Sequence, residues 1–295
     1  MTEKQKVLFI INPVSGVRHK KLDVFRKLIG DSLDHNRFDE EFITTAYQGH
    51  ATEITKEAYD SGIRTFVVAG GDGSVNEVGA VLAGTDATLG IIPEGSGNGL
   101  AHHLNIPGKT AESISVLNRF KTVKIDTCMV NEVFFASIAG IGFDARVARQ
   151  FAKSKHRGFI TYARIVLKEY FTYKPGKYTL KLDGKELKTR AFFISFANSN
   201  QFGYNTRIAP NASLTDGMID VCIVRKPPLF AIPLLAHLVF RKRVDRSKYM
   251  DLRRAAEIII KRKKGKTVNV DGEPVKMQKE LNISIRPASL NVLVP

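Results

Sequence analysis

The sequence has few of the features that mark secreted, disulfide-stabilised or membrane-spanning proteins. Only two of its 295 residues are cysteines, Cys128 and Cys222, and both lie in apolar strand-like runs without metal-ligand spacing. We therefore expect two buried core thiols in a protein of the reducing cytoplasm. The N-terminus shows no charged-then-apolar signal segment, and no apolar run in the sequence is long enough to span a bilayer.

Acidic residues are scarce relative to basic ones. The 29 Asp and Glu residues against 45 Lys and Arg residues give a net charge of +16. Such an excess favours anionic partners, which are nucleotides, nucleic acids or an anionic membrane surface. The chain shows no zinc-finger spacing, no aromatic RNA-binding signature and no other nucleic-acid module, so we expect no nucleic-acid partner.

A glycine loop lies between an apolar strand and a helix. Phe66 to Ala69 read as a short buried strand, and a helix is predicted from Ser74. Between them, Gly70-Gly71-Asp72-Gly73 presents backbone N–H groups at a positive helix end, which suits a phosphate. Asp72 is unusual there, because a carboxylate repels phosphates unless a cation lies between them or the carboxylate accepts a proton. An ordinary turn with Asp72 as a cap is the alternative.

Two further junctions repeat this pattern. The apolar strand 89–92 is followed by PEGSGNGLA at 93–101, and the strand 7–11 is followed by NPVSG at 12–16. Parallel strands separated by helices place such loops side by side at their carboxyl ends, where open α/β sheets bind ligands. Three such loops in one domain predict a nucleotide-phosphate site.

The order of expected elements divides the chain in two. Residues 1–122 alternate strands with helices, which predicts a three-layer α/β domain with a mainly parallel sheet. Residues 123–295 read mostly as antiparallel strands, with helices near 144–152 and 158–173, and predict a β-rich second domain. We leave open whether the last strand returns to the first domain.

The motifs together resemble the catalytic domain of the diacylglycerol kinase and sphingosine kinase superfamily. The three loops are joined by later motifs in the family order: Ile125-Asp126, IAGIGFD at 138–144, ASLTDGMID at 212–220 and VDGE at 270–273. The resemblance covers nearly the whole chain and is greatest to the short bacterial soluble lipid kinases. It implies an NAD-kinase/diacylglycerol-kinase-like first domain, a β-sandwich-like second domain that receives the lipid, and ATP in the cleft between them.

The resemblance also implies the residues of the ATP site. They lie in the three loops, at the end of the strand predicted before residue 46, and in the helix predicted from Ser74. These residues are Asn12, Pro13, Ser15, Gly16, Thr45, Gly70, Gly71, Asp72, Gly73, Ser74, Asn76, Glu77, Gly95, Ser96, Gly97 and Asn98.

Phosphoryl transfer needs charge neutralisation and a proton acceptor for the attacking hydroxyl. Carboxylates in the motifs are the candidates: Asp72, Asp126, Asp144, Asp271 and Glu273. By resemblance we expect Asp271 to be the base with Glu273 beside it, and Asp72 and Asp126 to organise a catalytic Mg²⁺ partly through water. In sphingosine kinases the equivalent of Asp72 is favoured as the base.

The resemblance implies a second, structural Mg²⁺ site. The carboxylate of Asp216 and the carbonyl groups of Ser213 and Met218 would supply hard oxygen ligands. Without the family, the Thr-Asp-Gly sequence at 215–217 reads only as a turn.

The substrate stays open at this point. Many diacylglycerol kinases have Asp where this chain has Gly99, and GSGNGLA looks closer to the sphingosine kinase pattern. We expect an ATP- and Mg²⁺-dependent kinase of a diacylglycerol-like or related long-chain lipid. The alternatives are a sphingoid-base kinase, an NAD kinase and a non-catalytic nucleotide- or lipid-binding regulator.

Two stretches are candidates for contact with a membrane. Residues 228–240 are almost wholly apolar and run into Arg241-Lys242-Arg243, and residues 160–173 mix aromatic and aliphatic residues with cations. An apolar face flanked by cations suits anionic headgroups, although a buried helix with a solvated basic end explains either stretch equally well. We expect a cytoplasmic protein, peripheral to the inner face of the membrane, and leave a homodimer open.

Overall fold

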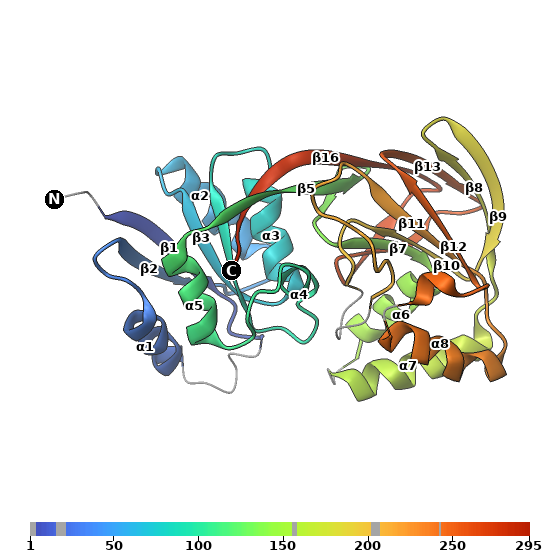
Figure 1. The fold of residues 1–295 in the computed structure, drawn as a ribbon, viewed down its shortest axis with the longest axis horizontal. Helices are drawn as coiled ribbons and strands as arrows, with labels where there is room; N and C mark the ends of the chain where they lie inside the picture. The colour runs from blue at the N-terminus through green and yellow to red at the C-terminus, as the bar shows by residue number, and fades with distance from the viewer. Residues whose placement is uncertain (1–3, 16–21, 155–157, 202–206, 242) are drawn as a thin grey trace. The chain divides into compact units, whose positions relative to one another are not determined.

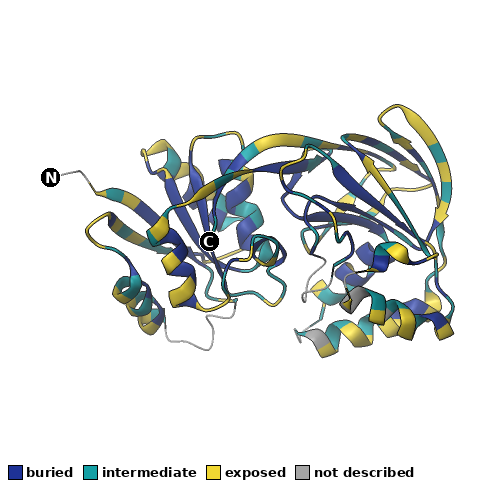
Figure 2. Ribbon diagram, in the orientation of Figure 1, coloured by how far each residue is buried: buried dark blue, intermediate teal, exposed yellow. Residues whose placement is uncertain are grey.

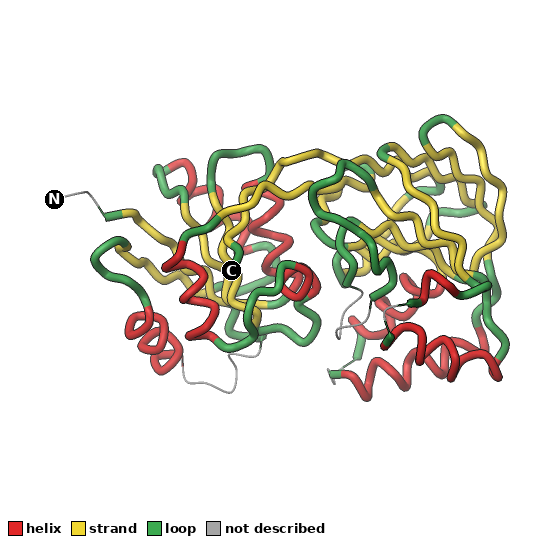
Figure 3. The backbone as a smooth tube through the Cα atoms, in the orientation of Figure 1, coloured by secondary structure: helices red, strands yellow, loops and turns green. Residues whose placement is uncertain are grey.

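The computed structural model describes residues 4–15, 22–154, 158–201, 207–241 and 243–295. The chain divides into two compact units, Met1–Ile125 with Ala288–Pro295, and Asp126–Pro287. Figure 1 shows the elements in chain order, and Figure 3 separates helices from strands. The predicted fold class, a parallel-sheet α/β domain followed by an antiparallel β-sandwich domain, is confirmed.

A parallel sheet forms the centre of the first unit. Its strands, in the order β2-β1-β3-β4-β16, are β1 (Gln5–Ile11), β2 (Phe38–Thr44), β3 (Thr65–Gly70), β4 (Thr88–Pro93) and the C-terminal end of β16 (Glu280–Leu293). Ile11 is in register with both Thr44 and Ala69, and Gly70 with Pro93, so the carboxyl ends are level. The loops that follow these ends therefore gather at one edge of the sheet.

Helices cover both faces of this sheet. They are α1 (Leu22–Ser32), α2 (His50–Asp60), α3 (Asp72–Leu82), α4 (Gly99–His103) and α5 (Thr110–Arg119). Phe25 of α1 and Ile114 of α5 join one core cluster with Phe9 of β1. The alternate residues Leu8 and Ile10 are buried as well, so neither face is left to solvent.

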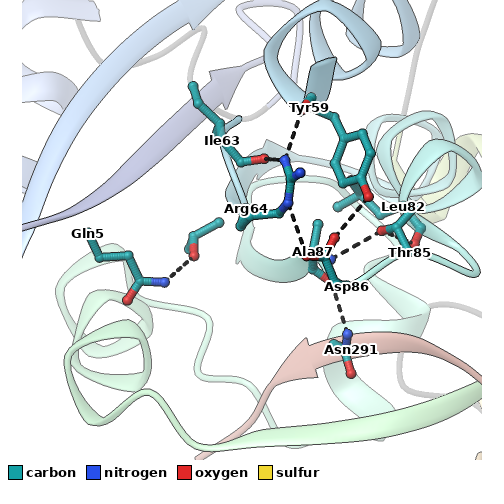
Figure 4. A network of polar contacts seen from close by, with 10 residues as sticks. Gln5, Tyr59, Ile63, Arg64, Leu82, Thr85, Asp86, Ala87 and Asn291 are labelled. Carbon is teal, nitrogen blue, oxygen red and sulfur yellow. Dashed lines mark hydrogen bonds and ion pairs between the residues drawn. The ribbon is translucent and has the colours of Figure 1, made fainter. Parts of the chain in front are cut away.

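A polar network lies at the opposite, amino-terminal end of β3 and β4 (Figure 4). Arg64 donates to Asp86 at 3.1 Å, and Tyr59 donates to the same carboxylate at 2.8 Å. Asn291 of β16 donates to the carbonyl of Ala87 at 3.1 Å. The network ties the last strand to β4 at the end of the sheet away from the glycine loops.

Two sheets form the second unit. One has the order β12-β11-β10-β7-β14-β15, and its strands are β7 (Ile138–Gly142), β10 (Phe193–Ala197), β11 (Ile219–Val224), β12 (Met250–Ala255), β14 (Lys266–Val270) and β15 (Glu273–Met277). The other contains β5 (Thr122–Val130), β6 (Val133–Phe135), β8 (Gly176–Leu182), β9 (Lys185–Ala191), β13 (Glu257–Arg262) and the start of β16. Buried residues of both sheets, including Ile141, Phe196 and Ile258, form one core cluster. Figure 2 shows the inner strands, such as β7, β10 and β11, as mostly buried, whereas the outer strand β9 is largely exposed.

Helices of the second unit pack on an aromatic cluster. They are α6 (Phe143–Ala152), α7 (Phe159–Thr172) and α8 (Ile232–Phe240), with the short 3₁₀ turns η2 (Leu229–Ala231) and η3 (Val244–Arg246). The cluster contains Phe143, Tyr170 and Phe192, and Ile232 packs against it. No helix among the described residues is long and apolar enough to cross a bilayer.

Two strands differ from what the sequence predicts. β12 was not expected, because its sequence MDLRRA lacks an alternating apolar pattern. It lies at the edge of its sheet, where backbone pairing with β11 stabilises it. The sequence pattern at 281–285 predicts only a short last strand, yet β16 runs from Glu280 to Leu293, and its last residues pair with β4.

Candidate active site

The first loop is bonded to the start of α3. The backbone N–H of Asn12 donates to the carbonyl of Ala69 at 2.9 Å, and its side-chain amide donates to the Ser74 hydroxyl at 2.9 Å. Ser15 donates its hydroxyl to the carbonyl of Asn12 at 2.7 Å. The family resemblance placed these residues in one site. The hydrogen bonds bring the loop at 12–16 and the glycine loop at 70–73 together. Gly16, expected in the same site, lies outside the described residues.

Asp72 joins the other two loops. One of its carboxylate oxygens accepts the N–H of Asn98 at 2.9 Å, and the other accepts the N–H of Gly99 at 2.6 Å. Asn98 adopts a left-handed conformation (φ 52°), and its side chain bonds to both the N–H and the carbonyl of Gly95. The carboxylate of Asp72 therefore orders the loop at 95–99 through these hydrogen bonds. This role does not depend on any metal that it could bind.

Glycines are required where these two loops meet. A Cβ atom on Gly95 would lie 2.5 Å from the Cα of Gly71, and one on Gly97 would lie 2.5 Å from the Asp72 carboxylate. Backbone contacts this close leave no room for any side chain. The glycines at 71, 95 and 97 thus allow the two loops to pack directly on each other.

Some residues expected at the nucleotide have other partners in the structure. Glu77 accepts the backbone N–H groups of Gly49 and Ala51 at 2.9 and 3.1 Å, so it caps the start of α2. Thr45 is buried, and its N–H donates to the carbonyl of Ile11. Ser96, by contrast, is exposed.

The loops fit an anionic ligand at the start of α3. The N-cap of this 11-residue helix is Gly71, which has no side chain that could cap the first N–H groups. Such an end carries partial positive charge and binds phosphate groups. Pro13 directly follows Asn12, which bonds to Ser74, and Asn76 belongs to α3 itself. The arrangement suits the phosphates of a nucleotide.

In the second unit, Asp271 is held by three backbone groups. It follows β14 with a left-handed φ of 46°. Its carboxylate accepts the N–H groups of Ala136, Ser137 and Ile138 at 2.8, 3.0 and 2.8 Å. The residue expected to be the base therefore orders the segment between β6 and β7, a duty that the sequence did not reveal.

Glu273 lies two residues further on, and its environment differs. It begins β15 and is exposed, and no hydrogen bond or ion pair to its side chain is recorded among the described residues. Its carboxylate is therefore open to a hydroxyl donor, which is the geometry that a general base needs.

Asp126 is buried and organises the loop at 213–218. Its carboxylate accepts the N–H of Gly217 at 2.8 Å, and its own N–H donates to the carbonyl of Leu214. The sequence missed its neighbour Asn198, whose amide donates to the carbonyls of Asp126 and Ala136 at 2.8 and 2.7 Å. Asn198 follows β10 directly, and a polar residue at a strand end was the available signal.

The residues expected to hold a structural Mg²⁺ do not present an open carboxylate. Asp216 forms an ion pair with Arg254 and accepts the N–H of Met218 at 3.1 Å. The Ser213 hydroxyl accepts the N–H of Thr215. A guanidinium group at Asp216 opposes a second cation there, so this arrangement does not fit the magnesium site that the resemblance implies.

Asp144 is the most strongly perturbed carboxylate of the site motifs. It lies in the first turn of α6, is 6% exposed, and accepts the Asn269 amide at 3.0 and 3.2 Å. Burial raises the pKa of Asp144 to about 6, although the hydrogen bond from Asn269 opposes the shift. Gly140 makes room for this carboxylate, since a Cβ there would overlap it.

Glycine loops at parallel strand ends and carboxylates in a β-rich second unit define a phosphotransferase. Residues 6–130 match the diacylglycerol kinase catalytic domain, and residues 137–294 match the YegS C-terminal NAD kinase beta sandwich-like domain. The chain belongs to the family of diacylglycerol kinases and YegS-like lipid kinases, and it is an ATP-dependent lipid kinase.

Individual relatives align with nearly the full length of this chain. It is 27% identical to a diacylglycerol kinase of Mycobacterium tuberculosis over 98% of this chain and 95% of the relative. It is 27% identical to a diacylglycerol kinase of Bacillus subtilis, over 91% and 90%. A crystal structure of a diacylglycerol kinase from Bacillus anthracis str. Sterne has a TM-score of 0.77 at 21% identity, over 100% and 98%, which shows the same fold.

We expect Gly95→Ala to disorder the phosphate loops, because its Cβ would lie 2.5 Å from the backbone of Gly71. The affinity for ATP, measured by titration calorimetry, should fall at least about tenfold while the second unit stays folded. Gly30→Ala is the matched control, since a Cβ at that position meets nothing within 4 Å. Unchanged ATP affinity in Gly95→Ala would show that the loop contact is not needed for the nucleotide.

We expect Asp144→Asn to stabilise the protein at neutral pH. The folded-state pKa of about 6 lies above the ordinary 3.8, so the folded state loses stability as pH rises through this interval and Asp144 ionises. The variant should exceed wild type by up to roughly 3 kcal/mol at about pH 7.5, and the difference should vanish below about pH 4. Urea unfolding across this range measures it, with the exposed Asp60→Asn as control. A less stable variant at neutral pH would mean that the ionised carboxylate itself holds α6.

Proposed function

We propose that this kinase transfers the γ-phosphoryl group of ATP to the hydroxyl group of a diacylglycerol. The observation that carries the proposal is the bonding of Asp72 to the backbone of Asn98 and Gly99. These hydrogen bonds pack two glycine loops together. The start of α3 beside them has no side-chain cap, because its N-cap residue is Gly71. Relatives named diacylglycerol kinase that align over nearly the whole chain support this acceptor.

Each group of residues has a distinct task in this proposal. Backbone N–H groups of the loops at 70–74 and 95–97 hold and orient the phosphates. A Mg²⁺ ion bound with ATP would neutralise charge on the phosphates, and carboxylates such as Asp72 and Asp126 are suitable donors for it or for its waters. We derive no role for a second ion at Asp216, because Arg254 already pairs with that carboxylate.

The proton acceptor that the geometry favours is Glu273. A base must be free to approach the acceptor hydroxyl, and Glu273 is exposed while Asp271 accepts three backbone N–H groups. Asp271 then fixes the turn from which Glu273 projects. This assignment revises the expectation from the resemblance, in which Asp271 was the base and Glu273 its neighbour.

A panel of acceptors tests the substrate. Radiolabelled ATP is offered with diacylglycerol, a sphingoid base or another long-chain alcohol in mixed micelles, and with NAD in solution. Label in the diacylglycerol supports the proposal. Label in the sphingoid base would favour the alternative suggested by Gly99, and label in NAD would assign the chain an NAD kinase activity. Label in none of them, with ATP bound, would favour a regulator.

We expect Glu273→Gln to lower kcat by roughly 10²–10⁴-fold, the usual effect of removing a positioned general base. The KM for ATP should hardly change, because the phosphates are held by the first unit. The exposed Glu132→Gln is the matched control and should keep wild-type turnover.

Asp271→Asn completes the comparison. It places an amide NH₂ against backbone donors, so it should lower the melting temperature in a thermal scan before it affects chemistry. Normal turnover in Glu273→Gln, together with lost turnover in a fully folded Asp271→Asn, would return the role of base to Asp271.

We further propose that the second unit binds an anionic membrane surface through α7 and the segment at 229–240. Ile160, Leu167 and Phe171 are 69%, 58% and 62% exposed, and Arg164 and Lys168 lie on the same face of α7. Phe230 is 84% exposed before α8. Apolar side chains flanked by cations insert at the headgroup boundary. Of the basic run after α8, Arg241 and Arg243 are exposed, and Lys242 lies outside the described residues.

We expect the double variant Phe171→Ser, Phe230→Ser to bind vesicles at least about tenfold more weakly in a sedimentation assay, because each exposed ring would leave the interface. Activity on a short-chain, water-soluble substrate should survive. Val24→Ser, which removes an apolar side chain that is 57% exposed in the first unit, is the control. Equal loss on soluble and membrane substrates would mean that the two rings support the fold or the active site instead.

A further inference from the structure

A cavity of about 980 Å³ opens in the second unit, and neither Asp271 nor Glu273 lines it. Its walls come from the start of α6, residues 173–178 at the start of β8, the turn at 262–265, and the open end of the hairpin formed by β14 and β15. Its volume lies at the upper end of the range of small-molecule sites. The cavity has no place in the kinase function proposed above.

The charge of this cavity is one-sided. Nine of the described residues that line it are Lys or Arg, and none is Asp or Glu. One of the nine, Arg146, forms an ion pair with Glu169, which does not line the cavity. Lys263, Lys264 and Lys266 come from the basic turn that follows β13 and from the start of β14, while Lys174 and Lys177 come from the connection after α7 and from the start of β8. Like charges that converge on one cavity repel each other, and an anion in the cavity would offset this repulsion. A smaller cavity of about 570 Å³ shares Lys177, Arg262 and Lys263 with it and is lined by further cations.

Arg262 is the buried part of this surface. It is 8% exposed, and its guanidinium donates to the backbone carbonyls of Lys266, Met277 and Gln278 at 3.0, 3.3 and 2.8 Å. Among the described residues, no carboxylate pairs with it. Burial lowers the pKa of Arg262, as expected for a cation removed from water without a counter-ion. The carbonyl groups orient the guanidinium, but they do not neutralise its charge.

The rest of the wall is built from close contacts. Tyr173 and Tyr178 share a side-chain hydrogen bond, and burial raises the pKa of both hydroxyl groups. Gly176 packs against the ring of Tyr178, where a Cβ would lie 2.8 Å from its atoms. Gly265 packs in the same way on the carbonyl of Met277, at 2.9 Å. The wall of the cavity between the cations is therefore tightly packed.

The cavity and the turn that carries Glu273 lie at opposite ends of one hairpin. Lys266 begins β14 and lines the cavity, while Asp271 follows the last residue of β14. Four strand steps separate Lys266 from Val270, a distance of about 13 Å. A ligand of the size of a phosphate group in the cavity would therefore not reach the proposed base.

We propose that this cavity binds a phosphate-bearing anion. The shared chemistry is a phosphate ester or polyphosphate with at least two negative charges, matched to the lysines of the turn at 263–266 and to Arg262. It has two possible sources, the headgroup of an anionic phospholipid or a free phosphate compound. The cavity is a second anion site, separate from the glycine loops of the first unit.

The test uses Lys263→Glu, Lys264→Glu as a double variant of the full chain. Both side chains are exposed, so the substitutions should not disturb the core. Lys153→Glu, Lys185→Glu is the matched control, because both lysines are exposed, lie in the same unit outside either cavity, and change the net charge equally. Circular dichroism confirms folding of both variants.

One arm titrates inorganic pyrophosphate by calorimetry, with saturating ADP present to occupy the glycine loops. The other arm sediments phosphatidylcholine vesicles with and without phosphatidylglycerol. The variant Lys263→Glu, Lys264→Glu should bind pyrophosphate or anionic vesicles roughly tenfold more weakly or worse, and the control variant should not. Loss of pyrophosphate binding alone identifies a free phosphate compound as the source, and loss with anionic vesicles alone identifies a lipid headgroup.

Three outcomes would overturn the proposal. They are equal losses in the two double variants, which would reflect net charge alone, no binding by wild type in either arm, and tighter cavity-dependent binding of a short DNA duplex than of either probe. None of these readouts requires kinase activity. Failure of this proposal and failure of the proposed function are therefore seen in different experiments.

Discussion

The bonds from Asp72 to the backbone of Asn98 and Gly99 are the constraint on which the first unit's site depends. They hold two glycine loops in contact at the carboxyl ends of β3 and β4. The level register of these parallel strands brings the loops within reach of each other. Once they pack, a side chain at Gly95 would overlap the backbone of Gly71, and the start of α3 remains open to phosphate groups. A carboxylate in a phosphate loop is thus explained by its neighbours in the chain before any metal is considered.

The second unit uses carboxylates in the same way. Asp271 accepts three backbone N–H groups, and Asp126 accepts one from the loop at 213–218. A carboxylate bound to backbone donors orders a loop without itself approaching a substrate. Glu273 is exposed beside such an ordered turn, and this combination of a rigid support and an open carboxylate suits a proton acceptor.

The excess positive charge has a spatial meaning that composition does not convey. Part of it flanks the exposed apolar side chains of α7, and part of it surrounds the cavity at Arg262. A net charge of +16 predicts only that the partners are anionic. The positions of the lysines in the fold separate the surface that we propose for a bilayer from the cavity that we propose for a single phosphate-bearing group.

The sequence by itself determined the fold class and predicted that the glycine loops gather at one edge of the parallel sheet. Apolar strands followed by glycines at 70–73 and 95–99 are local patterns, and alternation of strands and helices places their ends together whatever the details of packing. The sequence did not predict edge strand β12 or the full length of β16. Backbone pairing with β11 and β4, rather than their own side-chain pattern, stabilises these segments.

Only the tertiary structure decided what each carboxylate does. Asp271 and Glu273 are neighbours in one short motif, yet one binds Ala136, Ser137 and Ile138 and the other is open to solvent. Those partners lie more than a hundred residues away, and no local pattern encodes which oxygen they will meet. The same reason places Arg254 at Asp216, where the family resemblance implied a magnesium ion. Hydrogen bonds and ion pairs between distant segments depend on where packing brings the chain.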